Sequence, residues 1–235
     1  INVGLEDELL SELSESRNVR KLSRADLAHC LVKKETGATT VAATMIIAKL
    51  AGIKIFATGG IGGVHKFAEQ TFDISADLQE LSSTSVSVVC AGPKAILDIP
   101  KTLEVLETLG VPVITYRQAK LPAFWSSDSP FASPLSLDDA HSIAKSHKIR
   151  ENLGLPGGQL IANPIPEEDQ IPFEIIEPIV IEAVKQANQS NIIAKEVTPF
   201  ILSKINQLSK GKSLLANIAL IKNNAKLASK IALCF

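Results

Sequence analysis

Short apolar runs alternate with glycine turns and amphipathic segments through the middle of this chain. Residues 54–57 (KIFA) lead into a glycine-rich turn at 58–63, and residues 85–91 (SVSVVCA) form a second apolar run. An amphipathic segment over 99–109 precedes a third run at 111–116 (VPVITY). Strands and helices that alternate in this way are typical of parallel sheets with right-handed crossover connections. The sequence therefore predicts an α/β fold with a largely parallel sheet.

Helical periodicity and one further apolar run account for most of the remaining chain. Residues 17–21 and 36–40 are expected to form a loop and a polar turn. No repeat, low-complexity tract or domain boundary interrupts the pattern, so the sequence predicts a single domain over residues 1–235. A fourth strand is expected at 158–163, and helices are expected over residues 4–16, 23–32, 41–51, 99–109, 137–152, 173–189, 199–208 and 213–233.

Residues 121–134 (LPAFWSSDSPFASP) combine proline and serine with large aromatic side chains. A flexible linker rarely carries such side chains, because each aromatic ring gains free energy only when it finds a packing partner. We therefore expect an ordered excursion in which Phe124, Trp125 and Phe131 are packed.

Charge and composition narrow the classes of function. The chain has 24 Lys and Arg residues against 25 Asp and Glu residues, which leaves no basic surplus for a nucleic acid. No apolar run approaches the ~20 residues of a membrane span, and residues 1–4 resemble neither a signal nor a transit peptide. Three cysteines fit a reducing compartment better than a disulfide framework. We expect a cytoplasmic protein with no nucleic-acid partner and no membrane partner.

Two interpretations are open for the turn TGGIGG at 58–63. Its backbone N–H groups could cradle a phosphate, because glycine lets the backbone approach a ligand closely. Alternatively, it is a tight turn from a strand to a helix. The spacing differs from the G-x-G-x-x-G dinucleotide signature, which makes a nucleotide-cofactor oxidoreductase a weak third reading. His65 follows the turn, where α/β proteins often place their sites.

Two aspartates lie four residues apart in FDISAD. If Ser75 begins a helix, Asp73 lies just before it and Asp77 falls in its first turn. Asp77 then complements the dipole of that helix, which is a structural role. The functional interpretation is that Asp73 holds Mg²⁺ or Mn²⁺, since one carboxylate suffices for a cation that keeps most of its waters.

Two lysines are candidates for binding and chemistry. Lys94 follows the apolar run 85–91, and an amine at the end of a buried strand is partly desolvated. Desolvation lowers a lysine pKa and favours the neutral amine that forms Schiff bases. Lys21, with Arg20 and Arg24 beside it, could hold a phosphate as a point charge. Both lysines could equally be solvated.

These features lie within longer runs of sequence that resemble one known family. The runs are ETGATTVAATM, ATGGIGGVH, FDISADLQEL, VVCAGPKAILDIPKTLEVLETLGVPV, NPIPEE and SLLANIALIKNNA. In this order and spacing, they resemble the pseudouridine-5′-phosphate glycosidase family, also called the indigoidine-synthase-A-like family, over essentially the whole chain. The resemblance implies a three-layer α/β/α core, a homotrimer and a divalent cation, usually Mn²⁺. It also implies reversible cleavage of the C–C glycosidic bond of pseudouridine 5′-phosphate to uracil and ribose 5-phosphate.

The resemblance further implies roles for individual residues. Lys94 in CAGPK matches the lysine that forms a Schiff base with C1′ of the opened ribose, and Asp73 in FDISAD matches the metal ligand. The other positions that match substrate contacts or polar residues near the site are Lys21, Val41, Ser75, Ala76, Asp77, Asn217 and, as a candidate catalytic residue, His65. A lysine suits the chemistry, because a C–C bond cannot be broken by protonating a leaving oxygen.

The chain also departs from the family pattern. The proton-donating glutamate of the family lies in an ALEST-like segment that neither Glu6 nor Glu8 matches, so we expect an N-terminally truncated chain. Two readings stay open: an active glycosidase, or an impaired relative that keeps only trimer formation and sugar-phosphate binding. Residues 193–195 replace a G-K-like entry, and Lys210 replaces a glycine of a T-G-G-like turn. Where that glycine supplied a positive φ, Lys210 is expected to be strained.

Overall fold

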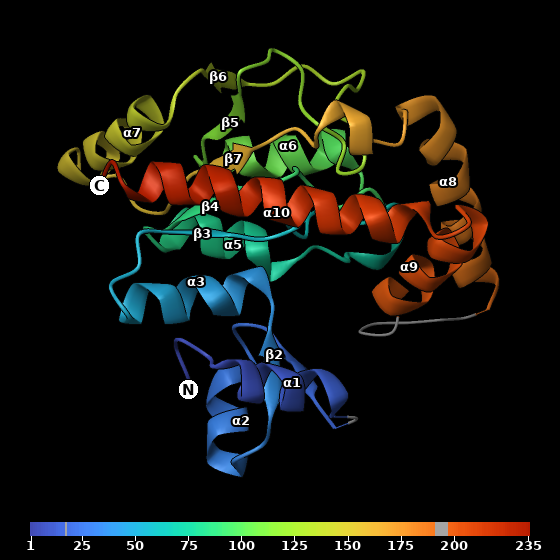
Figure 1. The fold of residues 1–235 in the computed structure, drawn as a ribbon, viewed down its shortest axis with the longest axis horizontal. Coiled ribbons are helices and arrows are strands. Elements are labelled where there is room, and N and C mark those ends of the chain that lie inside the picture. The colour runs from blue at the N-terminus through green and yellow to red at the C-terminus, as the bar shows by residue number, and fades with distance from the viewer. Residues whose placement is uncertain (17, 191–196) are drawn as a thin grey trace.

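The computed structural model describes residues 1–16, 18–190 and 197–235 and contains two parallel sheets (Figure 1). The expectation for residues 193–195 lies outside the described residues. Among the described residues, no helix has both the length and the apolar character needed to cross a membrane.

The larger sheet has five strands, all parallel. Their order across the sheet is β3 (Ile55–Ala57), β4 (Ser87–Cys90), β7 (Leu160–Ala162), β5 (Val113–Tyr116) and β6 (Leu135–Leu137). The prediction of a largely parallel sheet is therefore confirmed, and four of the strands are those that the sequence predicts. The exception is β6, a short edge strand with an exposed Leu135, which lies where no strand is expected.

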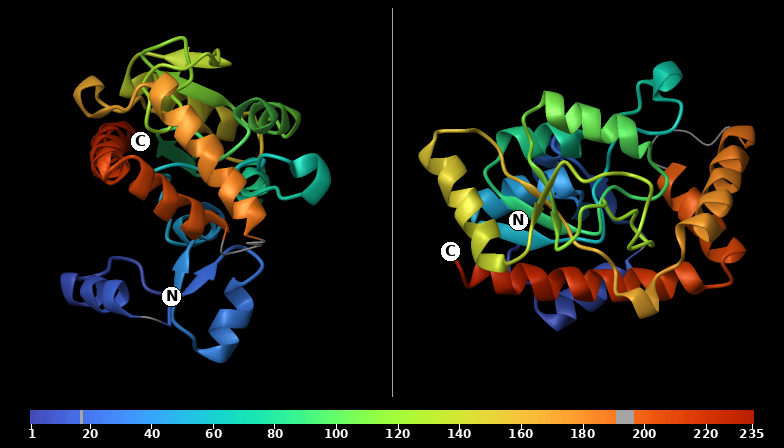
Figure 2. Two further views of the ribbon diagram at one scale, coloured as in Figure 1. Left: turned by 90° about the vertical axis from the view of Figure 1, so that its right-hand side faces the viewer. Right: turned by 90° about the horizontal axis from the view of Figure 1, so that it is seen from above.

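Helices cover both faces of the larger sheet, as the two turned views also illustrate (Figure 2). Val88 and Cys90 of β4 face one core, and Val89 between them faces the other, as the alternation of side chains along a strand requires. The first core is closed by α3 (Val41–Leu50), α5 (Ala76–Ser83) and α6 (Ile99–Thr108). The second core is closed by α7 (Ala140–Asn152) and α10 (Lys212–Ala232). The three-layer α/β/α architecture is thus confirmed.

A third core lies beside the sheet, where α8 (Phe173–Gln189) and α9 (Val197–Leu208) pack against each other and against α10. Phe124 and Trp125 belong to this core and are 6% and 1% exposed. The excursion over 121–134 is therefore ordered, as predicted. Two short elements, α4 (Ala68–Thr71) and η1 (Glu167–Asp169), complete the main body.

Residues 1–16 and 18–39 form what we call the N-terminal lobe, which extends below the main body in Figure 1. It contains α1 (Asp7–Glu15), β1 (Arg20–Leu22), α2 (Leu27–Lys33) and β2 (Gly37–Thr39). The loop predicted at 17–21 and the turn predicted at 36–40 are wrong where strands form instead, because β1 and β2 pair in parallel with Lys21 opposite Ala38. Residue 17 lies outside the described residues. Close packing explains why position 37 is a glycine, since a Cβ there would clash with the side chain of Leu22.

The turn before α10 contains the strain that the sequence predicts. Lys210 has a φ of 52° and Gly211 has a φ of 82°, so both residues adopt the left-handed conformation. Glycine tolerates this conformation, whereas a side chain costs about 1–2 kcal/mol there. The prediction for Lys210 is confirmed.

Replacing Lys210 with glycine should therefore raise the free energy of unfolding. Relief of about 1–2 kcal/mol of backbone strain, less about 0.4–1 kcal/mol for the greater entropy of an unfolded glycine, leaves a net gain of about 0.5–1 kcal/mol. Urea denaturation followed by circular dichroism measures this change. Gly211→Ala is the matched control, because nothing lies within 4 Å of its Cβ and only backbone strain is added. A destabilised Lys210→Gly would contradict the assignment.

Candidate active site

The candidate site begins at the carboxyl edge of the larger sheet, where β3 and β4 end side by side. The glycine-rich turn follows β3, and the segment that carries Lys94 follows β4. The two are joined by backbone hydrogen bonds, from Ile61 N to Gly92 O at 3.2 Å and from Lys94 N to Ile61 O at 3.1 Å. This pairing fixes Lys94 next to the glycine-rich turn.

Close packing explains why this turn needs glycine. A Cβ at Gly60 would lie 2.7 Å from a ring carbon of Phe124, and a Cβ at Gly62 would clash with the hydroxyl of Ser75. The N–H groups of Ile61 and Gly62 already donate to protein oxygens. The geometry therefore favours the tight-turn interpretation over a phosphate cradle for this part of the turn.

Asp77 joins three elements through one buried carboxylate. Its Oδ1 accepts a hydrogen bond from Ala42 N in the first turn of α3, and its Oδ2 accepts one from Gly62 N, both at 2.8 Å. Its side chain stands on α5, whose start at Ser75 is confirmed because Ser75 Oγ accepts from Asp77 N at 3.2 Å. The structural role expected for Asp77 is thus only half right: the carboxylate serves the N-terminus of α3, not that of its own helix.

Lys94 has the partly desolvated amine that its position after a buried strand predicts. Burial lowers the pKa of Lys94 below its ordinary value of 10.5, and the charge of Lys21 lowers that pKa further. The neighbouring Asp77 and Cys90 act in the opposite direction and favour the charged amine. Burial also raises the pKa of Cys90 to about 12, so this thiol stays protonated and is no competing nucleophile.

His65 and Asp73 face each other across a short loop that contains α4. The Nδ1 atom of His65 lies 3.8 Å from an oxygen of Asp73, and His65 N donates to Asp73 O at 3.0 Å. Burial lowers the pKa of His65, and the charges of Lys21 and Lys94 lower it further, against the effect of Asp73. His65 is therefore a neutral imidazole near pH 7, whereas Asp73 is an exposed carboxylate.

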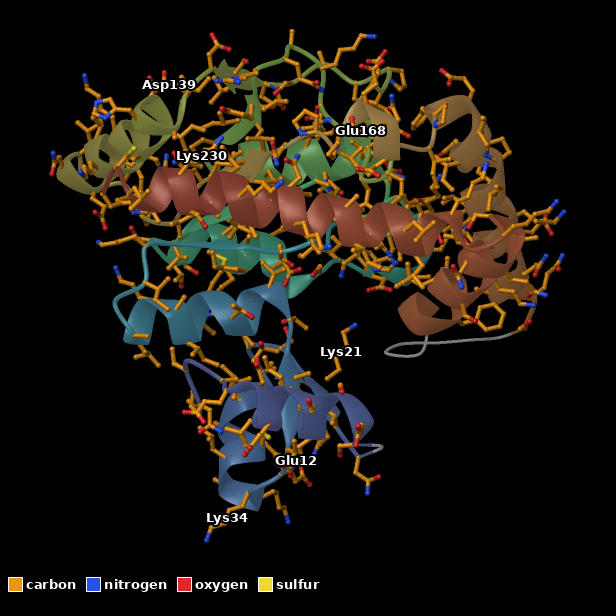
Figure 3. All side chains as sticks on the ribbon, viewed as in Figure 1. Glu12, Lys21, Lys34, Asp139, Glu168 and Lys230 are labelled. Atoms are coloured by element: carbon orange, nitrogen blue, oxygen red, sulfur yellow. The ribbon has the colours of Figure 1, made fainter. Side chains whose placement is uncertain are left out.

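Lys21 reaches the site from the N-terminal lobe. Figure 3 shows its side chain projecting from β1 toward the main body. Its charge acts on both Lys94 and His65, so the three side chains lie near one another. Val41 lies beside Ala42 in the first turn of α3, and its side chain is buried in the core.

Three asparagines of α10 each hold a different segment at the carboxyl edge. Asn217 Oδ1 accepts from Trp125 Nε1 at 2.8 Å, and Asn223 Nδ2 donates to Pro164 O at 2.8 Å. Asn224 Nδ2 donates to Thr58 O at 2.9 Å, directly before the glycine-rich turn. Sequence reasoning named only Asn217 for the site and missed Asn224. A buried asparagine on the apolar face of an alanine-rich helix is the signal that marks it.

The structure thus brings together most of the residues that the sequence singles out. His65 lies 3.8 Å from Asp73, and the charges of Lys21 and Asp77 act on the pKa of Lys94, whereas Asn217 is held by Trp125. Within the described part of the chain, no cluster of three or more His, Cys, Asp or Glu side chains could enclose a metal ion. The Asp77 carboxylate already accepts two backbone hydrogen bonds, which leaves the exposed carboxylate of Asp73 for a cation that keeps most of its waters.

A family model described as "Indigoidine synthase A like protein" matches residues 1–234. The chain belongs to this family. The resemblance drawn from its sequence runs is therefore confirmed.

Two similar curated relatives carry the same name. Pseudouridine-5′-phosphate glycosidase from Paracoccus denitrificans is 60% identical over 99% of this chain and 77% of its own length. The protein of the same name from Roseobacter denitrificans is 58% identical over 99% of this chain and 75% of its own length.

Two solved structures share the fold. The prealnumycin C-glycosynthase AlnA, in complex with ribulose 5-phosphate, is 36% identical with a TM-score of 0.91. It aligns over 98% of this chain and 76% of its own. An indigoidine-synthase-A-like protein from Thermotoga maritima is 33% identical with a TM-score of 0.88, over 97% of this chain and 75% of its own.

The double hydrogen bond at Asp77 predicts a large effect of Asp77→Asn. The NH2 group of an asparagine amide can only donate and its one oxygen can replace only one carboxylate oxygen, so the N–H of Ala42 or of Gly62 would lose its acceptor inside the core. We expect the free energy of unfolding to fall by about 2 kcal/mol, the usual cost of a buried unsatisfied donor. Urea denaturation measures the loss.

Asp139→Asn is the matched control for this substitution. Asp139 is an exposed N-cap whose Oδ1 accepts from Ser142 N at 2.8 Å. Asparagine caps helices as well as aspartate does, so this variant should keep its stability. Equal losses of unfolding free energy in the two variants would contradict the double hydrogen bond assigned to Asp77.

Proposed function

We propose that this chain cleaves the C–C glycosidic bond of pseudouridine 5′-phosphate to uracil and ribose 5-phosphate, and that the reaction is reversible. The proposal rests on one observation above all: the Lys94 amine is held at the carboxyl edge of the sheet with its pKa lowered by burial. Relatives named pseudouridine-5′-phosphate glycosidase, at 55–60% identity over 99% of the chain, support the same reaction. The enzyme is a carbon–carbon lyase acting on a nucleotide.

The reaction follows from what an amine can do at C1′. Opening of the ribose ring breaks the bond between C1′ and the ring oxygen, which takes a proton, and the neutral Lys94 amine bonds to C1′. The C–C bond to the base then breaks as the base takes up a proton at C5, and the nitrogen lone pair forms the C=N bond of a Schiff base. Water hydrolyses this bond, which frees Lys94 and leaves ribose 5-phosphate.

Other residues of the site bind and orient the substrate. Lys21 is a mobile point charge suited to the 5′-phosphate. His65 is neutral and so can accept or donate a proton near C1′. We assign the remaining substrate contacts to Val41, Ser75, Ala76, Asp77 and Asn217, with Asp77 acting mainly by fixing the turn and α3.

Asp73 is the residue that would hold a divalent cation, Mn²⁺ or Mg²⁺. Its carboxylate is half exposed, which leaves room for the waters that such a cation keeps. When bound, the cation would supply positive charge close to the anionic substrate. The resemblance to the family is also the basis for proposing a homotrimer located in the cytoplasm.

The alternative function is an impaired relative that only binds sugar phosphates and forms trimers. It is not favoured, because identity to the glycosidases extends over 99% of the chain and because the amine, the imidazole and the carboxylate of the site lie together.

Lys94→Ala should abolish covalent trapping of ribose 5-phosphate by borohydride, because no other amine replaces the Schiff-base nitrogen. Intact mass spectrometry with Mn²⁺ present measures the adduct. Trapping by the unsubstituted chain should persist at a pH where exposed lysines are protonated, since burial lowers the pKa of Lys94. Lys120→Ala, at an exposed lysine paired with Asp128, is the control and should trap normally. Undiminished trapping in Lys94→Ala would exclude Lys94 as the nucleophile.

Asp73→Asn should remove cation binding, because it deletes the one negative charge that the site offers to the metal. Titration of Mn²⁺ followed by electron paramagnetic resonance counts the bound ions independently of activity. Asp98→Asn, at the N-cap of α6, is a suitable control because its carboxylate is paired with Lys101. An unchanged Mn²⁺ titration for Asp73→Asn would reject this ligand.

A further inference from the structure

A buried carboxylate ties the N-terminal lobe to the main body. Glu80 lies on α5, and its side chain is 3% exposed. One of its oxygens accepts a hydrogen bond from the hydroxyl of Thr84, and the other lies 3.2 Å from Nη1 of Arg24. The geometry of this second contact is that of an ion pair without a hydrogen bond. Arg24 belongs to the N-terminal lobe, so the ion pair crosses from one part of the molecule to the other.

The same short segment of the lobe carries Lys21. Arg24 lies two residues beyond the end of β1, and Lys21 is the central residue of that strand. The lobe has a second connection to the main body at this point, because Thr40 N donates to Leu22 O at 2.8 Å just before α3. A shift of β1 would therefore move Lys21 relative to the site.

The helix that receives Arg24 is also the helix that organises the site. Asp77 stands one turn before Glu80 on α5 and fixes both α3 and the glycine-rich turn. The ion pair therefore connects the strand of Lys21 to the element that sets the surroundings of Lys94. By contrast, Arg20 and Glu35 pair with each other on the exposed surface of the lobe.

We propose that Arg24 and Glu80 are positioning residues that hold Lys21 at the active site by tying β1 to α5. This inference rests on the proposed function, in which Lys21 binds the phosphate of the substrate. This positioning role explains why Glu80 is buried as a charge, since hydrophobic residues of similar size are often at least as stable as a buried ion pair.

The first test uses Glu80→Gln, which keeps the size of the side chain and an acceptor for Thr84 but removes the charge that holds Arg24. The KM for pseudouridine 5′-phosphate should rise at least about fivefold while kcat changes little. Lys21→Met should raise KM as well. The double variant Glu80→Gln/Lys21→Met should have the same KM as Lys21→Met alone, because the ion pair between Arg24 and Glu80 acts through Lys21. Additive effects, or a lower melting temperature with an unchanged KM, would overturn the proposal.

Two further variants guard against misfolding as an explanation. Arg24→Gln should reproduce the rise in KM. Arg24→Lys, which keeps a positive charge within reach of Glu80, should return KM to the value of the unsubstituted chain. Glu35→Gln is the matched control, because it breaks a charged pair of the same lobe that does not reach the main body. A rise in KM for Glu35→Gln equal to that for Glu80→Gln would contradict a specific role of the ion pair between Arg24 and Glu80.

A second measurement needs no substrate and separates this inference from the proposed function. Trace acetylation with acetic anhydride over a range of pH, read by mass spectrometry, gives the pKa of Lys94. The titratable groups that act on Lys94 are Asp77 on α5, Lys21 on β1 and the thiol of Cys90 at the end of β4. Loss of a nearby negative charge alone would lower the pKa of Lys94, whereas departure of Lys21 raises it toward 10.5.

Glu80→Gln should therefore raise the pKa of Lys94, as Lys21→Met does. A lowered or unchanged pKa would show that Lys21 stays in place and would overturn the positioning role. If the unsubstituted chain neither turns over the nucleotide nor traps ribose 5-phosphate, the proposed function fails, while this measurement still reports where Lys21 lies.

Discussion

The buried carboxylate of Asp77 is the interaction on which the rest of the site depends. An unpaired charge in a protein interior is costly, and this one is stabilised by two backbone N–H groups and by the N-terminal end of α3. Those two donors lie 35 and 15 residues away from Asp77 in the chain. A single side chain therefore fixes the distance between α3, α5 and the turn after β3. Because the turn is bonded to the segment after β4, the position of Lys94 follows from the same interaction.

The reactivity of Lys94 results from opposing electrostatic effects. Burial and the charge of Lys21 favour the neutral amine, while Asp77 favours the charged one. Two lysines near each other would repel strongly if both were charged, so the arrangement is stable only because carboxylates lie close by and one amine is desolvated. The same pairing suits the reaction proposed for this chain, in which a charged Lys21 would bind the phosphate while a neutral Lys94 would attack carbon.

The main sheet and its helices could be predicted from sequence because long apolar runs and helical periodicity determine them locally. In the N-terminal lobe the two helices were predicted but the two strands were not, since β1 and β2 have three residues each and are stabilised by pairing with each other across α2. Lys94, Asp73 and Lys21 were identified through long motifs that resemble a family. The sequence predicted a structural role for Asp77 but not its hydrogen-bond partners, because those partners come from other elements. Asn224 and Glu80 were missed since their partners, Thr58 O and Arg24, are 166 and 56 positions distant.

The site is assembled from two parts of the molecule that are held with different strength. Lys94 follows β4 at the carboxyl edge of a five-stranded sheet that has a core on each face, and backbone hydrogen bonds join its segment to the glycine-rich turn. Lys21 stands on a two-stranded sheet in a lobe whose first helix buries no residue. The proposed nucleophile thus belongs to the more rigid part, whereas the residue proposed to bind the phosphate belongs to the less stable part. Since chemistry at C1′ depends on accurate placement of the amine, and a phosphate tolerates a point charge from a range of directions, this division places rigidity where the reaction needs it.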